Sequence, residues 1–406
     1  MQSTAKLQTA TIPQAQPVAA VKAKAATRLA YIDIIRMILI ILVIMVHAAV
    51  TYGGFGDWTY HDGTLVEDEL TGILLSLFVF LCQSFFMGLF FFFSGVFTPG
   101  SHDRKGTVRF WKDRLLRLAI PMAAYTWLLS RIPNYINAVA NHGLTQSFWQ
   151  YSVQTFLAEA DGGPTWFLFA LLVFSLAYTL WRFVSRRMNL DLSWANRLPA
   201  PGTKTLLVAA LGISAAMFAV AQLTPIPQAY KALNAFNLLL AFFPAYILLF
   251  TGGILAYRNQ WLERFSGKML RFWAWLSAAL VVILPAYIIL GGATDNGLDP
   301  FLGGLTWQCA GLCLWFGFAC IAFSTALTLW LRDRILPQSK VAAAAGPNTF
   351  AVYLIHPLVL VPICYGLSFI ALPAMVKFGL ASASTVALCY MLAGRLRRLP
   401  GAKAIL

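Results

Sequence analysis

An acid, a guanidinium and an imidazole lie within one apolar stretch near the amino terminus, at Asp33, Arg36 and His47. Charged or titratable groups among lipid-like neighbours cost free energy, so they are usually paired or functional. In an α-helix, residues three apart and eleven apart fall on the same face, so all three side chains share one face. Arg36 and His47 would be about 16 Å apart along the axis, at about 1.5 Å per residue. The spacing predicts a helix that carries a cation near one membrane surface and a base deeper in the bilayer.

Two further arginines, Arg114 and Arg117, have the three-residue spacing of neighbours on one helical face. Neighbouring guanidiniums form forked hydrogen bonds to anionic oxygens, which suits a phosphate-rich ligand. The alternative is that both only anchor a span at the cytoplasmic surface. Arg36, likewise, has the alternative role of a structural ion-pair partner for Asp33. The spacing alone leaves both alternatives open.

A second histidine in an apolar segment, His356, lies in the sequence Tyr-Leu-Ile-His-Pro at residues 353–357. A lone histidine in a span is either packed and hydrogen-bonded or functional, and the residue type does not decide between these roles. His61, His102 and His142 fall in predicted loops, where we expect ordinary solvated side chains. The sequence has no zinc-ligand spacing such as His-Glu-x-x-His, so we expect no metal site. The cysteines all lie in apolar segments and are expected to be small packing side chains.

The composition identifies the class of protein. Of the 406 residues, 59% are hydrophobic and 11% are charged, whereas a soluble domain carries about 25% charged residues. We therefore expect an all-α fold, a polytopic transmembrane helical bundle of about ten spans, each near the length of about 20 residues that crosses a bilayer. The expected spans are 30–51, 71–97, 115–132, 164–184, 205–223, 236–257, 272–291, 305–330, 349–371 and 374–394.

The distribution of charge predicts the orientation. With a cytoplasmic amino terminus, nearly all of the 30 Lys and Arg residues fall in inner segments, with Arg36 in the membrane and Arg131, Lys231 and Lys377 outside. This asymmetry predicts that both termini are cytoplasmic. Because the basic residues lie in short loops and not in a soluble basic domain, nucleic acid is not an expected partner. We expect a disordered cytoplasmic tail over residues 1–27, a transmembrane domain over 28–398 and a cytoplasmic tail over 399–406.

Taken in order, the motifs of residues 28–398 resemble the acyltransferase 3 family of integral membrane proteins. Each motif is short, and the resemblance depends on their order and placement. The motifs are Tyr-Ile-Asp-x-x-Arg at 31–36 followed after ten residues by His47, Phe-Phe-x-Ser-Gly at 91–95, Arg-x-x-Arg-Leu-x-x-Pro at 114–121, Gly-Pro-x-Trp-Phe at 163–167 and Tyr-Leu-Ile-His at 353–356.

The resemblance implies an acyltransferase that transfers groups other than aminoacyl groups. It implies transfer of an acyl group, acetyl or succinyl, from cytoplasmic acyl-coenzyme A to a hydroxyl of an extracytoplasmic or membrane-associated saccharide or glycolipid. Acyl-coenzyme A would be a co-substrate, with no permanently bound cofactor, and the bilayer would be that of the bacterial inner membrane. By matching motifs, His47 would be the catalytic base and Arg36, Arg114 and Arg117 would hold the donor. Supporting roles would fall to Asp33, Ser94, Trp166, Tyr353 and His356.

An alternative from another functional class stays open, a proton-coupled transporter or exporter of an anionic lipid or saccharide. It would use Asp33 and His47 as a proton relay. Thioester cleavage distinguishes the two functions, because a transporter moves its substrate without cleaving acyl-coenzyme A. A purely structural membrane subunit would explain the spans but not the polar face of the first one. The sequence does not determine the oligomeric state.

Overall fold

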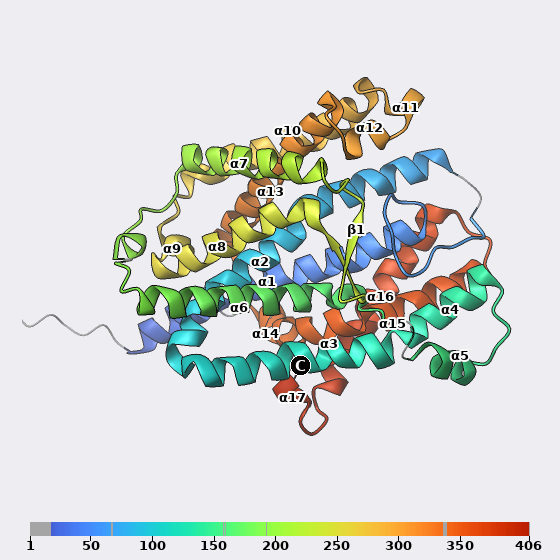
Figure 1. The fold of residues 1–406 in the computed structure, drawn as a ribbon, viewed down its shortest axis with the longest axis horizontal. Coiled ribbons are helices and arrows are strands. Elements are labelled where there is room, and N and C mark those ends of the chain that lie inside the picture. The colour runs from blue at the N-terminus through green and yellow to red at the C-terminus, as the bar shows by residue number, and fades with distance from the viewer. Residues whose placement is uncertain are drawn as a thin grey trace, which may run out of the picture.

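A computed structural model describes residues 18–65, 68–156, 158, 160–191, 193–335 and 339–405. Over these residues the chain is almost entirely helical, and nine helical segments are long and apolar enough to cross a membrane. Figure 1 shows the long helices packed side by side in one bundle. The predicted all-α polytopic bundle is confirmed, and the protein is a multi-pass membrane protein.

The long helices of the bundle are α1 (Val18–Thr51), α2 (Glu69–Arg114), α6 (Trp166–Arg187), α7 (Thr203–Ala221), α8 (Phe243–Arg258), α10 (Lys268–Leu290), α13 (Trp307–Arg334), α15 (Thr349–Ser368) and α16 (Ala374–Leu396). The shorter helices are α3 (Ile120–Ala124), α4 (Arg131–His142), α5 (Phe148–Thr155), α9 (Trp261–Arg264), α11 (Ala293–Asn296), α12 (Asp299–Leu302), α14 (Lys340–Ala345) and α17 (Ala402–Ile405). Two π-helical turns, η1 (Leu115–Ala119) and η2 (Tyr125–Leu129), and four 3₁₀ turns, η3 (Gly163–Thr165), η4 (Ser193–Asn196), η5 (Leu240–Phe242) and η6 (Gly346–Asn348), complete the helical elements.

The second and third predicted spans belong to one helical run, Glu69–His142. This run begins at the N-cap Asp68, whose carboxylate accepts a hydrogen bond from the Thr71 backbone N–H at 3.4 Å. The hydrogen bonds from Thr71 lower the pKa of Asp68. The run is interrupted at Gly106, where φ is 71°, and Figure 1 shows the chain turning back there and returning through η1, α3, η2 and α4. Both predicted spans are therefore present within a single reversing segment.

The expected disorder of the amino-terminal tail requires a correction. Helix α1 begins at Val18, so residues 18–27 of the expected disordered tail are helical, while residues 1–17 lie outside the described residues. The reason is the alanine-rich sequence of 18–27, which has high helix propensity and lengthens the helix before the first span, Ala30–Thr51. At the other end, part of the segment 399–406 forms α17, which contacts η1; its predicted cytoplasmic location stays a prediction.

The predicted span 236–257 is also partly wrong. Its first residues form β2 (Phe236–Leu239), which pairs antiparallel with β1 (Ala229–Ala232), and the helix α8 begins only at Phe243. A three-residue turn joins the strands, with Leu233 and Asn234 at positive φ. A short apolar run fits a strand as well as a helix, so hydropathy alone did not detect this hairpin.

Helices α2 and α8 approach each other through two glycines. A Cβ atom at Gly95 would lie 2.1 Å from the carbonyl oxygen of Phe250, and one at Gly253 would lie 2.1 Å from that of Phe92. Only glycine permits this backbone contact, a common way for membrane helices to pack closely. The contact holds Ser94, next to Gly95, at the wall of the central cavity. Elsewhere in the core, all six cysteines are buried and free, as expected for packing side chains.

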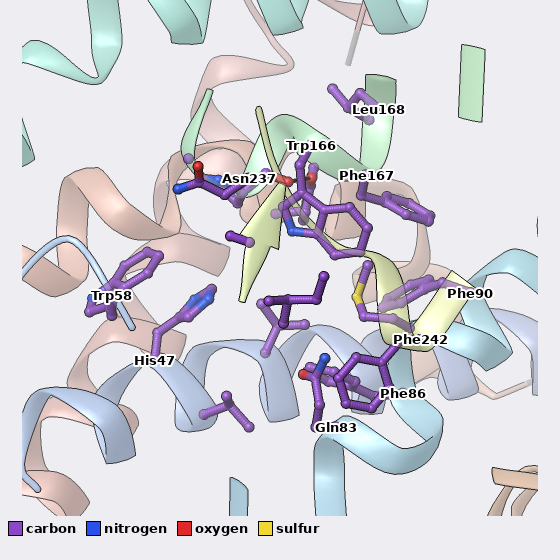
Figure 2. A pocket seen from close by; sticks show the side chains of 18 of the residues that line it. His47, Trp58, Gln83, Phe86, Phe90, Trp166, Phe167, Leu168, Asn237 and Phe242 are labelled. Atoms are coloured by element: carbon purple, nitrogen blue, oxygen red, sulfur yellow. Dashed lines mark hydrogen bonds between the residues drawn. The ribbon is translucent and has the colours of Figure 1, made fainter. Parts of the chain in front are cut away.

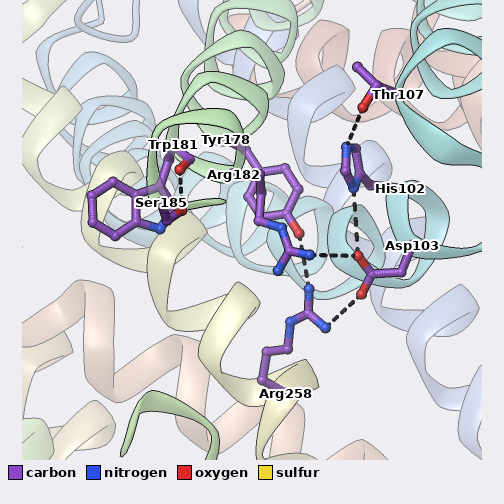
Figure 3. A network of polar contacts seen from close by, with 8 residues as sticks. All are labelled: His102, Asp103, Thr107, Tyr178, Trp181, Arg182, Ser185 and Arg258. Atoms are coloured by element: carbon purple, nitrogen blue, oxygen red, sulfur yellow. Dashed lines mark hydrogen bonds and ion pairs between the residues drawn. The ribbon is translucent and has the colours of Figure 1, made fainter. Parts of the chain in front are cut away.

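A polar network joins α2, α6 and α8 just before the point where the chain reverses at Gly106 (Figure 3). Asp103 of α2 accepts ion-pair contacts from Arg182 of α6 at 3.4 Å and from Arg258 of α8 at 2.6 Å. Arg258 also donates to the hydroxyl oxygen of Tyr178 at 3.2 Å. One carboxylate thus connects three helices that are distant in sequence, and it engages two of the basic residues predicted to face the cytoplasm.

His102 lies beside this network, and its surroundings differ from those expected from the sequence. Its side chain is buried, with its Nε2 atom 3.2 Å from the hydroxyl of Thr107 and its Nδ1 atom 3.6 Å from the Asp103 carboxylate. The expectation that His102 is a solvated loop side chain is therefore wrong. The hydrogen bond to Thr107 spans the interruption at Gly106, so His102 braces the point where the chain reverses.

Candidate active site

One large cavity runs through the bundle, with a volume of about 1180 Å³. It exceeds the usual size of a small-molecule pocket, about 300–1,000 Å³. Arg36 and His47 both line it, which confirms the prediction that these two residues share a face of the first helix. The lining also includes side chains from α2, α4, α6, α8, α13, α15, the 52–65 loop and the β1–β2 hairpin.

Two arginines line one end of the cavity, which we call the basic end and define by Arg36 and Arg114. Arg36 lies 3.7 Å from the Asp33 carboxylate, and the Arg36 side chain is 36% exposed. Arg114 donates a hydrogen bond to the Thr98 hydroxyl at 2.9 Å, and its guanidinium carbon lies 5.1 Å from the centre of the Phe110 ring. A guanidinium has five N–H donors, so these contacts leave donors of both arginines available to an anionic ligand.

Arg117 has different surroundings from Arg114. It is exposed, and it is not among the described residues that line the cavity. It lies in the π-helical turn η1, where hydrogen bonds run from i to i+5 and a turn contains more residues than in an α-helix. The three-residue spacing therefore no longer brings its side chain next to that of Arg114. A donor-binding role for Arg117 stays a prediction.

His47 has a partner that is 309 residues away in sequence. Its Nδ1 atom lies 3.0 Å from Nε2 of His356, a fully buried residue of α15. Nδ1 of His356 lies 2.6 Å from the carbonyl oxygen of Tyr353. The indole of Trp58 stacks on the His47 ring, with centroids 3.7 Å apart and planes 11° apart. Figure 2 shows His47 rising from α1 into the cavity with Trp58 beside it; the sequence analysis did not detect Trp58, which lies in an irregular loop.

The other predicted supporting residues cluster around the same space. Ser94, Trp166 and Tyr353 line the cavity. The hydroxyl of Tyr353 donates a hydrogen bond to the carbonyl oxygen of Pro164, which ties α15 to the start of α6. Asp33 is not among the described residues that line the cavity, but it contacts Arg36, and Arg36 lines the cavity. The structure thus brings together residues from five separate motifs, whose pairwise contacts do not follow from their positions in the sequence.

The helical run η1, α3, η2 and α4 separates Asn134 from Arg114 by 20 residues, which is more than about 20 Å along the axis, so Asn134 marks an end of the cavity opposite the basic end. This end carries polar side chains. We call it the polar mouth and define it by Asp57, Asn134, Asn137, Asp161, Lys231 and Asn237. The Asn134 amide donates to the Asp161 carboxylate at 2.9 Å. None of these residues belongs to a motif that predicts a site. Asn134 and Asn137 have the three-residue spacing of one helical face, which is the only local signal that could have indicated them.

The loop that carries Trp58 is fixed at both of its ends. The Thr51 hydroxyl lies 3.0 Å from the carbonyl oxygens of both His47 and Tyr60. Asp62 forms a 3.0 Å ion pair with Lys377 at the start of α16, with side chains 0% and 4% exposed. Burial raises the pKa of Tyr60 to about 12. These contacts hold the loop so that Trp58 remains against the His47 ring.

Comparison with known proteins identifies the family. Searches of curated proteins and of solved structures found no match. A family model described as an acyltransferase domain, that of the acyltransferase 3 family, matches residues 29–394. The match covers nearly the whole chain, from the first span to the last, and includes every residue described above as lining the cavity. The chain therefore belongs to the acyltransferase 3 family and is a membrane acyltransferase.

Proposed function

We propose that the protein transfers an acetyl or succinyl group from cytoplasmic acyl-coenzyme A to a hydroxyl of an extracytoplasmic or membrane-associated saccharide or glycolipid. The observation that carries the proposal is a single cavity with arginines at one end, His47 in its wall and polar side chains at the other end. The basic end would face the cytoplasm, in agreement with the inner location of most Lys and Arg residues. The membrane would be the bacterial inner membrane, and acyl-coenzyme A would act as a co-substrate.

The basic end suits the donor. Coenzyme A carries phosphates, and guanidiniums such as Arg36 and Arg114 bind phosphate oxygens through charge-assisted, forked hydrogen bonds. The continuous helix α1 separates Arg36 from His47 by about 16 Å along its axis. A phosphate bound at the basic end would therefore leave the long pantetheine arm to bring the thioester to His47. The apolar side chains of Phe86, Phe90 and Met87 line the intervening wall.

The polar mouth suits a saccharide acceptor. The amide groups of Asn134, Asn137 and Asn237 each offer both hydrogen-bond donors and an acceptor, as the hydroxyl groups of a sugar require. Trp58 and Trp166 add aromatic surface with one polar N–H group each. A cavity of this volume accommodates part of the acceptor together with the reactive arm of the donor.

The proposed reaction is acyl transfer with general-base catalysis. His47 accepts the proton of the acceptor hydroxyl while its oxygen attacks the thioester carbonyl carbon. The new C–O ester bond forms, the C–S bond breaks, and the leaving thiolate of coenzyme A takes up the proton from the His47 imidazolium. Holding both substrates in one cavity supplies a further share of the rate enhancement, because the reacting groups no longer have to meet by diffusion.

The test uses membrane vesicles that contain the protein, with acetyl- or succinyl-coenzyme A labelled in the acyl group. We expect the label to appear in the carbohydrate or glycolipid fraction, and His47→Ala to reduce transfer by about 10²–10⁴-fold. His61→Ala is the matched control, since His61 is exposed in the loop after α1, and should retain wild-type transfer. Normal transfer by a correctly inserted His47→Ala variant would reject the base assignment. Flux of an anionic substrate without thioester cleavage would instead support a transporter.

A further inference from the structure

We propose that His356 is a positioning residue that determines which nitrogen of His47 carries the proton, and that Pro357 makes this possible by freeing a backbone carbonyl. The inference rests on the proposed role of His47 as the base. In this arrangement His47 donates a hydrogen bond to His356, and His356 donates one to the carbonyl oxygen of Tyr353. The other nitrogen of His47 then has a free lone pair.

The first step is the geometry of the two imidazoles. The rings of His47 and His356 are parallel to within 1°, and their centroids lie 5.1 Å apart. The distance between Nδ1 of His47 and Nε2 of His356 is 3.0 Å, about 2 Å less than the distance between the ring centroids. Two imidazole rings that point these nitrogens directly at each other would show nearly this difference, because each nitrogen lies about half of this difference from the centre of its ring. The rings therefore meet edge to edge in nearly one plane. In that arrangement the N–H of one ring points along the lone pair of the other, which is the best geometry for a hydrogen bond.

The second step is the direction of the chain. A carbonyl oxygen only accepts hydrogen bonds, so Nδ1 of His356, at 2.6 Å from the Tyr353 oxygen, must carry a proton. In neutral His356 the Nε2 atom is then an acceptor. The contact at 3.0 Å therefore requires that Nδ1 of His47 donates. Neutral His47 consequently has no proton on Nε2, and this nitrogen presents the lone pair that a general base needs.

The third step explains why the Tyr353 carbonyl is available. In an α-helix the carbonyl of residue i accepts from the N–H of residue i+4, which for Tyr353 is residue 357. That residue is Pro357, inside α15, and proline has no N–H. His356 is three residues after Tyr353, and helical side chains lean back toward the preceding turn. The imidazole thus reaches the carbonyl that the proline leaves without its usual donor.

The surroundings keep this arrangement in place. His356 is fully buried, so solvent cannot readily replace it as the partner of His47. Trp58 stacks on the His47 ring and restricts its rotation out of the shared plane. An edge contact from His356 and a face contact from Trp58 together fix both the plane and the rotation of the catalytic ring.

A spectroscopic test of the inference does not depend on catalytic activity. We would label the histidines of the full chain with ¹⁵N, place the protein in lipid nanodiscs, and assign His47 by comparison with His47→Gln. The imidazole ¹⁵N shifts report which nitrogen is protonated. We expect protonation of His47 at Nδ1 in the wild type, and a loss of this preference in His356→Leu. Protonation of wild-type His47 at Nε2 would overturn the inference.

A kinetic test uses two replacements of different chemistry. The amide of His356→Gln can accept from His47 and donate to Tyr353, whereas His356→Leu can do neither. We expect His356→Leu to lower the maximal rate of acyl transfer by about 10²–10⁴-fold. The lower figure is the effect of losing a hydrogen bond that supports a functional side chain, and the upper figure is the effect of a catalytic histidine in the wrong tautomer. His356→Gln should keep at least about a tenth of the wild-type rate. In both variants the concentration of acetyl- or succinyl-coenzyme A that gives the half-maximal rate should change by less than about twofold, as expected when a substitution affects only the transition state.

The two tests separate this inference from the proposed function. A wild-type rate in His356→Leu, or equal loss in His356→Leu and His356→Gln with both correctly folded by size-exclusion chromatography, would overturn the positioning role. If the wild-type protein transfers neither acyl group from its coenzyme A thioester while the ¹⁵N shifts still place the proton on Nδ1, the proposed function fails and the hydrogen-bond direction stands.

Discussion

Two carboxylate–cation pairs lie near opposite ends of the cavity and differ in how much solvent reaches them. In the pair Asp62–Lys377, near the polar mouth, the side chains are 0% and 4% exposed and the charged atoms are 3.0 Å apart. In the pair Asp33–Arg36, at the basic end, the side chains are 33% and 36% exposed and the atoms are 3.7 Å apart. The groups are chemically alike, but their burial assigns them different roles.

A buried pair has lost the hydration of both charges, so each partner depends on the other. Asp62 also accepts hydrogen bonds from the backbone N–H and the hydroxyl of Thr64, at 3.0 and 2.6 Å. That pair fixes the loop that carries Trp58. The pair that is about one-third exposed contributes little to stability, and Arg36 remains accessible to a ligand from the cavity. The difference separates charges that hold the site together from charges available for binding.

The largest expected effect comes from breaking the buried pair. Lys377→Met leaves the Asp62 carboxylate buried without its cation, and we expect the free energy of unfolding to fall by about 3–5 kcal/mol. Thermal unfolding of the purified protein in detergent measures this change. The double variant Asp62→Asn/Lys377→Met removes both charges and should recover much of the loss. A single variant as stable as the wild type would show that the pair does not hold the loop.

A smaller effect, on binding alone, is expected at the basic end. Arg114→Ala removes charge-assisted hydrogen bonds worth about 1.5–3 kcal/mol, so we expect the dissociation constant for acetyl-coenzyme A to rise by about 10- to 100-fold. Isothermal titration calorimetry on the purified protein measures it. Arg117→Ala is the comparison variant. Because Arg117 is exposed and lies in η1 outside the described lining of the cavity, we expect nearly wild-type binding, a result that would refute the predicted donor-binding role of Arg117.

These two variants also decide the prediction for Arg117. An equal loss of affinity in Arg114→Ala and Arg117→Ala would mean that the donor extends from the cavity onto the surface of η1. Wild-type affinity in both variants would remove Arg114 and Arg117 from the donor site and leave Arg36 as the cation of the basic end.

The smallest effect is expected for Asp33→Asn. The side chains of Asp33 and Arg36 are about one-third exposed, so loss of the pair should change the free energy of unfolding by less than about 1 kcal/mol. The rate of acyl transfer should stay within about twofold of the wild type, a change that corresponds to about 0.4 kcal/mol. Transfer assays on the variant in vesicles check this expectation. A loss as large as that of His47→Ala would show that Asp33 takes part in moving protons, as in the transporter alternative.

The local sequence determined the class of fold and the face of the first helix that lines the candidate site. Nearly every expected span is a helix, because long apolar runs in a membrane must satisfy their own backbone hydrogen bonds. Arg36 and His47 were expected on one face, and both line the cavity, because the periodicity of an α-helix depends only on the residues between them. Where the backbone departs from that periodicity, as in η1 around Arg117, the expectation from spacing no longer applied.

Only the tertiary structure decided which distant residues meet. Nothing in the first span indicates that His47 contacts His356, that Trp58 covers its ring, or that Asp62 pairs with Lys377. Within a membrane, helices associate through the shape of their packed surfaces and through a few polar contacts, and neither is encoded in the hydropathy of a single segment. The sequence therefore specified the helices and their polar faces, whereas the orientation of the candidate base depended on how α1, α15 and the loop between α1 and α2 pack together.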